Sequence, residues 1–311
     1  MSNPNALVEV DGLTRRFGAH HAVTDVTFSA MPGEVLGLLG PNGAGKTTTL
    51  RMLAGLLAPT SGHARVAGID VDADPIGARR HIGYLPEQAA PYDEMTVVAY
   101  LRFMARLRRV ARGSVRAAVD HVVEETGLAS VRRRLVGSIS HGFRQRLGLA
   151  AALVHQPAVL ILDEPTSALD PRQAAEAREL VGRLGADRTV ILSTHILSEA
   201  TRLCSRVVIV SRGEVVGVGP PDELARRAAA GKRQLRLRVR GPADEVAAAV
   251  RAVPGVDKVD TEVAGAELRL QVEVSAQVGP EVARRITDRF ELLELTEETP
   301  SLEQAFLSLT K

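Results

Sequence analysis

The sequence predicts an α/β domain built on a parallel sheet, followed by a smaller α+β domain. Three nearly continuous apolar runs support the first domain: Glu34 to Gly40 (EVLGLLG), Ala158 to Asp163 (AVLILD) and Thr189 to Ser193 (TVILS). Such runs are typical of strands buried on both faces, as in a parallel sheet covered by helices. Longer helical stretches alternate with short apolar runs over roughly the first two hundred residues, which is the order of a sheet with crossover helices.

Two further elements belong to the first domain. Ala6 to Val10 and Val23 to Phe28 alternate apolar and polar residues more strongly, which predicts an antiparallel piece beside the main sheet. Strand signals are absent from about residue 88 to residue 150, where amphipathic stretches such as Val97 to Val110 and Ser114 to Thr126 follow one another. We expect an inserted helical subdomain there.

The C-terminal part of the chain has a different pattern. Gln234 to Arg240 (QLRLRVR) and Leu268 to Val274 (LRLQVEV) alternate with period two, as half-buried antiparallel strands do. Helical stretches at residues 243–253 and 279–290 lie between or after them, followed by residues 291–295 and a short helix opened by Ser301. A small α+β domain is expected, with a ferredoxin-like arrangement as one candidate.

Length and composition agree with two folded domains. At about 150 residues per domain, 311 residues give a count of two, which we place at residues 1–230 and 232–311. The 45% hydrophobic and 24% charged residues are the balance of a globular protein, and the net charge of +2 argues against nucleic acid as the main partner. Cys204 is the only cysteine, so no intramolecular disulfide is expected.

The N-terminus and the apolar runs bear on the compartment. MSNPNALVEV lacks the basic start and apolar core of a signal peptide, and no apolar run approaches the roughly 18 residues of a membrane span. We expect a cytoplasmic protein, or one that reaches a membrane through a partner.

A phosphate-binding loop follows the first buried run. GPNGAGKTT has the GxxxxGKT spacing, in which glycines let consecutive backbone N–H groups point at one centre and the following helix adds its positive end. The lysine brings a charge to the terminal phosphates of ATP, and the first threonine suits a Mg²⁺ site. The predicted ATP-binding residues are Gly40, Pro41, Asn42, Gly43, Ala44, Gly45, Lys46, Thr47 and Thr48.

The second buried run ends in two acidic residues. Asp163 is placed to hold Mg²⁺ and Glu164 to act as general base on the attacking water. Together with the P-loop this pattern also fits kinases, GTPases and motor ATPases. A GTPase is disfavoured because none of the asparagines is followed by lysine, whereas the NKxD motif that recognises the nucleotide base requires this pair.

A second helix N-terminus that can bind an anion distinguishes between these classes of nucleotide-binding protein. In SHGFRQR, Ser140 and Gly142 open an apolar helix shortly before the Asp163 strand. With the surrounding ISHGFRQRLGLAAALVHQPAVLILDEPTSALDP, the chain resembles the ATP-binding subunits of ABC transporters, whose signature LSGGQ occupies this place, over about residues 5 to 225. The resemblance implies a P-loop NTPase fold and a site in which Ser140 and Gly142 contact ATP held by another subunit.

Other roles are implied by the same resemblance. Phe17 matches the aromatic residue that stacks on adenine, and His195 matches the switch histidine that contacts the terminal phosphate. Asp170 closes SALD, the loop that helps to build the dimer contact. Glu87 stands where the family usually has glutamine, and Gln88 follows it, so either residue is a candidate for the Mg²⁺-sensing and partner-sensing role.

The signature departs from the family pattern. Ile139 and His141 replace leucine and the first glycine, and Phe143 replaces glutamine, whereas Ser140 and Gly142 are kept. We interpret His141 as a tolerated surface substitution. Arginines also crowd the predicted helical subdomain, where a solvated face is the default interpretation and contact with acidic permease loops or anionic lipid heads is the alternative. They are Arg102, Arg106, Arg108, Arg109, Arg112, Arg116 and Arg132 to Arg134.

The resemblance gives a specific expectation. It implies that the chain is an ATPase that pairs head to tail with a second copy or a close paralogue and drives a separate permease from the inner face of the cell membrane. The segments SHGFRQR, YLPE and SLEQAFLSL resemble those of the family branch that serves type-2 exporters, which include drug, polysaccharide and gliding-motility systems. One alternative is a soluble ABC-type ATPase acting on ribosomes or DNA, and another is a regulatory module with an inactive site.

Overall fold

The computed structural model describes residues 5–88, 91–228, 233–264, 267–275, 278–298 and 302–309. It divides into two compact units, Met1–Pro221 and Asp222–Lys311. The domain boundary that the sequence predicts at residues 230–232 falls outside the described residues and stays a prediction. In the described part of the chain, no helix has the length and apolarity needed to cross a membrane.

A six-stranded sheet forms the centre of the first unit. Its order is β10-β9-β3-β8-β7-β6, and all neighbours are parallel except the antiparallel pair of β9 and β10. The three apolar runs of the sequence are the adjacent strands β3, β8 and β7, which confirms the predicted buried sheet. The strands are β3 Val35–Leu39, β6 Ile82–Leu85, β7 Val159–Asp163, β8 Thr189–Thr194, β9 Arg206–Ser211 and β10 Glu214–Gly219.

An antiparallel sheet of order β2-β1-β4-β5 accompanies it. The pairing of β1 (Val8–Phe17) with β2 (His20–Ala30) confirms the predicted antiparallel piece. The sequence did not indicate β4 (Ser61–Val66) or β5 (Ile69–Asp70), because SGHARV has only two positions that are buried. The helices of this part are α1 Lys46–Leu53, α2 Pro75–Arg80, α6 Pro171–Gly185 and α7 Leu197–Leu203.

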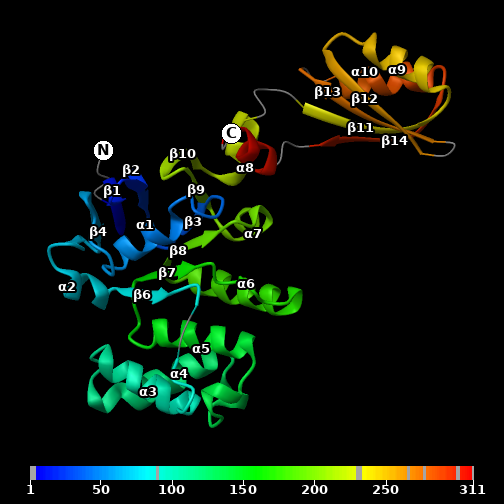
Figure 1. Cartoon of the computed structure of the whole chain (residues 1–311). Coiled ribbons are helices and arrows are strands. Elements are labelled where there is room, and N and C mark those ends of the chain that lie inside the picture. Colours follow the sequence, from blue (N-terminus) through cyan, green and yellow to red (C-terminus); the bar gives the residue numbers. More distant parts are fainter. Residues whose placement is uncertain are drawn as a thin grey trace. The chain divides into compact units, whose positions relative to one another are not determined.

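The inserted helical subdomain lies between β6 and β7 in the sequence. Although α3 (Val97–Leu107), α4 (Val115–Glu125) and α5 (His141–Leu153) separate them, these two strands pair directly, with Ile82 opposite Val159. The helices gather beside the β6 end of the sheet in Figure 1. Short 3-10 turns connect them at Arg112–Ser114, Ala129–Val131 and Val136–Ser138. The predicted insertion is therefore present.

The second unit contains a βαββαβ arrangement. Its antiparallel sheet has the order β12-β13-β11-β14, which is the ferredoxin-like order, with α9 and α10 packed on one face over an aliphatic core (Figure 1). The sequence anticipated this arrangement but not strand β12. The elements are α8 Pro221–Ala228, β11 Arg233–Arg240, α9 Ala243–Arg251, β12 Val256–Ala264, β13 Glu267–Val274, α10 Gly279–Thr287, β14 Glu291–Glu298 and α11 Leu302–Leu309. Ser301, expected to open the last helix, lies outside the described residues.

Candidate functional site

The P-loop connects β3 to α1 through backbone positions that only glycine fits. A Cβ atom on Gly40 would lie 2.4 Å from the carbonyl oxygen of Val210, and one on Gly45 would lie 2.5 Å from that of Ala22. Gly45 also has a φ of 101°, in the region that disfavours residues with a side chain. The loop is therefore packed against neighbouring backbone at two points, and α1 begins with Lys46 directly after it.

Lys46 is buried at this junction. Its Nζ donates a 2.8 Å hydrogen bond to the carbonyl oxygen of Gly40 and lies 3.3 Å from Oε1 of Glu164. Only 6% of the Lys46 side chain is exposed. An ammonium group held this way is screened little by water, so it attracts negative charge strongly at the mouth of the loop.

Asp163 ends β7 beside the same helix. Its Oδ1 accepts hydrogen bonds from Thr47 Oγ1 at 3.0 Å and from Ser193 Oγ at 2.7 Å. Its Oδ2 is buried without a hydrogen-bond partner among the described residues. A buried carboxylate oxygen with an open lone pair next to a threonine hydroxyl has the chemistry of a Mg²⁺ ligand set, since Mg²⁺ in phosphate sites takes one or two carboxylates plus phosphate and water oxygens.

Glu164 lies between two side chains that can carry positive charge. Its Oε1 faces Lys46, and its Oε2 lies 2.9 Å from Nδ1 of His195. Its backbone has a φ of 48°, a strained conformation for a residue with a side chain, and its N–H donates to Ser193 Oγ at 2.9 Å. The strained turn directs the carboxylate toward Lys46 of the P-loop.

A third buried carboxylate, Glu199, connects the loops of this site. Glu199, only 3% exposed, accepts hydrogen bonds from Thr166 Oγ1 at 2.7 Å and Thr194 Oγ1 at 3.3 Å, and it pairs with Arg178 at 2.9 Å. Thr166 follows Glu164 by two residues, and Thr194 precedes His195. Glu199 therefore joins the two loops that carry the Glu164 and His195 side chains.

Sequence analysis missed Ser193 and Glu199. Ser193 lies directly opposite Asp163 in the register of β7 and β8, so its hydroxyl reaches both Asp163 and the backbone of Glu164. The available signals were a polar residue ending an apolar strand and an acidic residue four positions after His195. Neither signal is specific without the strand register.

Several predicted site residues lie outside this cluster. Ser140 is exposed and caps α5 by accepting a 3.4 Å hydrogen bond from the N–H of Phe143, and Gly142 is buried against the side chain of Gln173. Asp170 caps α6 by accepting from the N–H of Gln173 at 2.9 Å. Within one chain, none of these three makes a hydrogen bond or ion pair with the Lys46–Glu164 cluster in the part that the structure describes.

Three further predicted residues, Phe17, Glu87 and Gln88, are exposed. Phe17 is 48% exposed and has the Arg15 guanidinium 4.7 Å from its ring centroid. Glu87 and Gln88 both follow β6 on exposed backbone, and the structure does not favour one over the other.

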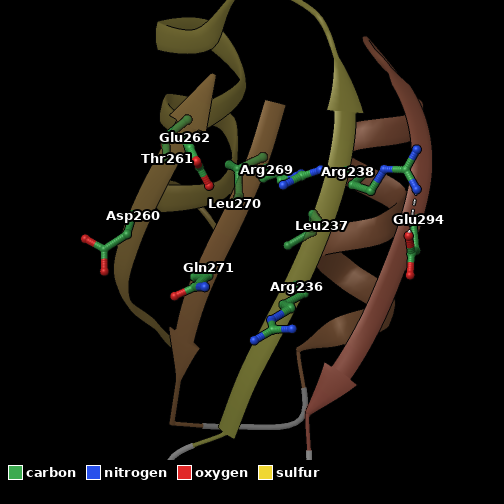
Figure 2. A pocket seen from close by; sticks show the side chains of 10 residues that line it. All are labelled: Arg236, Leu237, Arg238, Asp260, Thr261, Glu262, Arg269, Leu270, Gln271 and Glu294. Carbon is green, nitrogen blue, oxygen red and sulfur yellow. Dashed lines mark hydrogen bonds and ion pairs between the residues drawn. The ribbon is translucent and has the colours of Figure 1, made fainter. Parts of the chain in front are cut away.

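The outer face of the C-terminal sheet carries a second concentration of charge (Figure 2). A hollow of about 570 Å³ lies over β11 and its neighbours, with Arg236, Arg238 and Arg269 among its lining residues. Arg238 pairs with Glu267 at 3.0 Å and with Glu294 at 3.2 Å, as the dashed line in Figure 2 partly shows. In the described residues, no group of three or more histidine, cysteine or acidic side chains forms a metal site there or elsewhere.

Two family models match this chain. The one described as "ABC transporter" matches residues 23–167, and the one described as "ATP-binding protein DrrA1-3-like, C-terminal domain" matches residues 219–310. Daunorubicin resistance ATP-binding protein DrrA3 of Streptomyces coeruleorubidus is 36% identical over 307 residues, covering 97% of this chain and 95% of that protein. The chain belongs to the ATP-binding subunits of ABC transporters.

Other relatives agree with this assignment. Linearmycin resistance ATP-binding protein LnrL of Bacillus subtilis is 31% identical over 310 residues, covering 98% of both chains. A solved ATP-binding subunit of an ABC transporter superposes with a TM-score of 0.65 at 31% identity, covering 71% of this chain and 92% of that one. The ABC subunit is therefore an ATPase that works with a membrane permease, and the alternative of an ATPase acting on ribosomes or DNA is not supported.

Proposed function

We propose that this ABC subunit hydrolyses ATP at a site shared with a second subunit and powers antibiotic export through its permease. The observation that carries the proposal is the position of Glu164, held by Lys46 on one side and His195 on the other, next to Asp163. A carboxylate so placed can take the proton of a water that attacks the terminal phosphate.

The other side chains take complementary roles. Lys46 binds the terminal phosphates, and His195 holds Glu164 in place and reaches the phosphate that leaves. Thr47 and Asp163 would hold Mg²⁺, which would neutralise part of the phosphate charge. Gln88 is a candidate for a further Mg²⁺ ligand. Phe17, exposed beside the strand turn, offers a ring for the adenine base.

Glu164→Gln tests the base assignment. The amide keeps the shape of the side chain but cannot accept a proton, so we expect ATP binding to persist while turnover falls roughly a hundredfold or more. Lys46→Ala is the matched comparison, because it should weaken nucleotide binding itself. Binding by equilibrium dialysis and phosphate release by purified protein separate the two. Normal turnover in Glu164→Gln would refute the assignment.

A composite site explains why Ser140 and Gly142 stand apart from the P-loop of their own chain. Ser140 is exposed at the positive end of a 13-residue helix, which suits contact with a phosphate on a second subunit. We expect Glu164→Gln to form a dimer with ATP and Mg²⁺, and Ser140→Glu in the same background to prevent it by charge repulsion. Light scattering with and without ATP measures this. A monomer in both proteins would contradict the shared site.

Permease docking is assigned to an aromatic patch on the helical subdomain. Tyr92 contacts Tyr100 and Phe103 edge to face, with ring centroids 6.4 Å and 5.8 Å apart, and Leu107 continues the same face of α3. Tyr92, Phe103 and Leu107 are 55%, 37% and 63% exposed. Apolar area of this kind on a surface marks a protein contact, and docking there would hold the subunit at the inner face of the cell membrane. Phe103→Asp should abolish co-purification with the permease while sparing ATP binding.

The cargo is proposed from relatives. Relatives of this chain are named for resistance to linearmycin, daunorubicin and doxorubicin. We expect co-expression with the partner permease to raise the inhibitory concentration of such antibiotics in a sensitive host. Co-expression with Glu164→Gln is the control. Equal sensitivity in both strains would rule out these antibiotics as cargo.

A further inference from the structure

A second cavity lies at the opposite end of the sheet from the P-loop. It has a volume of about 830 Å³, and side chains from the end of α2, the α3–α4 connection and the turn before β7 line it. Arg80 comes two residues before β6, and Gln156 comes three residues before β7, so the cavity faces the amino ends of these strands. Asp163 ends β7 at its carboxyl end. Five residues of strand, roughly 15 Å, therefore separate the cavity from the ATP site.

The cavity concentrates positive charge without a counter-charge. Arg80, Arg108 and Arg109 line it, and no acidic residue does so in the part of the chain that the structure describes. None of these arginines has an ion pair with a described carboxylate. The lining residue His121 lies 3.7 Å from the carboxylate of Glu125, which already pairs with Arg188 at 3.0 Å.

Two other half-buried arginines of the same subdomain have carboxylate partners. Arg132 pairs with Asp120 at 2.8 Å, and Arg146 pairs with Glu176. Arg108, by contrast, is half-buried, and within the described part of the chain it donates only a long 3.5 Å hydrogen bond, to the carbonyl oxygen of Arg79. Burial and the neighbouring Arg79 charge lower the pKa of Arg108. Because a desolvated cation without a partner is costly, an anion bound beside it would be stabilised.

His155 adds one hydrogen-bond acceptor to the cavity, its Nδ1, which suits a hydroxyl group of a ligand. Its Nε2 lies 3.1 Å from the carbonyl oxygen of Ile82 and so carries the proton, while its Nδ1 is buried with no partner among the described residues. Ser114 and the amino end of the 11-residue helix α4 lie at the rim, where the helix adds partial positive charge. Val110, Ala118 and Val154 supply an apolar wall.

We propose that this cavity binds the phosphate group of a phosphorylated organic molecule. Guanidinium groups recognise phosphate through paired N–H donors, which suits a cavity that three arginines and no described carboxylate line. The volume is many times that of a single small ion, for which about 30 Å³ is the scale of one water, and the apolar wall suits the carbon part of the ligand. The phosphate group comes from a soluble phosphomonoester or from an anionic lipid headgroup.

The binding test uses the full-length chain with Lys46→Ala, so that the P-loop does not contribute phosphate binding. Glycerol 3-phosphate is titrated while the ring signals of His155, assigned with His155→Gln, are followed by NMR. Vesicles containing phosphatidylglycerol, with pure phosphatidylcholine vesicles as control, are tested by sedimentation. Binding of glycerol 3-phosphate alone identifies a soluble ligand, and binding to phosphatidylglycerol vesicles as well identifies a lipid headgroup.

Two pairs of substitutions localise the site. Arg80→Gln with Arg108→Gln removes two cavity charges, and Arg102→Gln with Arg106→Gln removes two exposed charges of α3 outside it. We expect the cavity pair to weaken binding at least about tenfold and the control pair less than about twofold. Arg80→Gln alone, at an exposed position, repeats the test if the pair unfolds the chain. Absent binding of both probes, unshifted His155 signals, or equal losses in both pairs would overturn the proposal.

Discussion

The ATP site and the outer face of the C-terminal sheet both contain ion pairs between a basic side chain and a glutamate, but one pair is buried and the other is exposed. Lys46 and Glu164 form an ion pair with 6% and 9% of their side chains exposed. Arg238 and Glu294 form one with 46% and 53% exposed. Each belongs to a larger group of charges joined by hydrogen bonds.

The difference shows where charged side chains interact strongly with each other and where water weakens their interaction. Buried charges interact strongly because water screens them little, and removing one partner leaves the other uncompensated. Exposed pairs contribute little, because water replaces each lost contact. Substitutions that are chemically alike should therefore have very different effects in the two regions.

The largest contrast is expected between two aspartates. Asp163→Asn removes the buried carboxylate beside Thr47 and should lower the rate of ATP hydrolysis a hundredfold to a thousandfold, on the order of the loss of one transition-state contact. Asp260→Asn, at a side chain 59% exposed, should leave that rate within about twofold. Steady-state phosphate release at saturating ATP and Mg²⁺ measures both. Comparable losses of rate in the two proteins would contradict the expected difference between buried and exposed charges.

The next contrast concerns the free energy of unfolding. Glu199→Ala leaves Arg178 and two threonine hydroxyls without their acceptor and should destabilise the first unit by about 3 kcal/mol. Glu267→Ala in the C-terminal sheet should cost less than about 1 kcal/mol. Differential scanning calorimetry resolves the unfolding of each unit. Equal effects would mean that burial does not govern these networks.

Acid should destabilise the chain through His155. Burial, followed by the charge of Arg108, lowers the pKa of His155 from 6.5 to about 4. The unfolded chain therefore takes up this proton first, and stability present above pH 6.5 is lost as the pH falls toward 4. We expect a loss of about 2 kcal/mol, less than the full shift implies because the ring is partly exposed. Urea unfolding at several pH values measures it, and His155→Gln should remove this part of the slope.

The smallest effect is expected at Arg238. Its guanidinium is paired with Glu267 and Glu294, which raise its pKa, yet it is solvated on the open face of the sheet. Arg238→Gln should shift the melting temperature of the C-terminal unit by less than about 3 °C, and added salt should reduce the shift further. A larger or salt-independent shift would show that this face carries more of the stability than its exposure suggests.

The parts of the fold that the sequence predicted are those with simple periodicity. EVLGLLG, AVLILD and TVILS are apolar at nearly every position, as central strands must be, and they became β3, β7 and β8. Strand β12 was missed because its core-facing pattern is interrupted. Only Val256 and Val259 of this strand pack on the core, and they lie three residues apart across a register shift, so no run of period two is visible in the sequence.

The candidate site divides in the same way. Lys46, Asp163 and Glu164 are fixed by local motifs, and the structure brings their side chains together with His195. Ser193 reaches them only through the pairing of two strands, which no local pattern specifies. The roles of Phe17, Ser140, Gly142 and Asp170 in ATP binding stay predictions, because they depend on a nucleotide and a second subunit.

The arginines of the helical subdomain illustrate the remaining limit. Their density in the sequence gave two interpretations, a solvated face or a contact with acidic loops or lipid heads. In the structure the arginines differ from one another. Arg102 and Arg106 are exposed, Arg132 pairs with a carboxylate, and Arg108 is half-buried with no ion pair to a described carboxylate. Pairing depends on which helices meet, so composition alone could not sort them.

The aromatic patch of the helical subdomain has a spectroscopic consequence. The chain contains no tryptophan and three tyrosines, of which Tyr92 and Tyr100 lie in the patch and Tyr84 lies in β6. Two of the three intrinsic fluorophores therefore report on the surface assigned to the permease. Binding of a partner there would alter the ultraviolet emission of this subunit directly, and association could be followed in real time without attaching a dye.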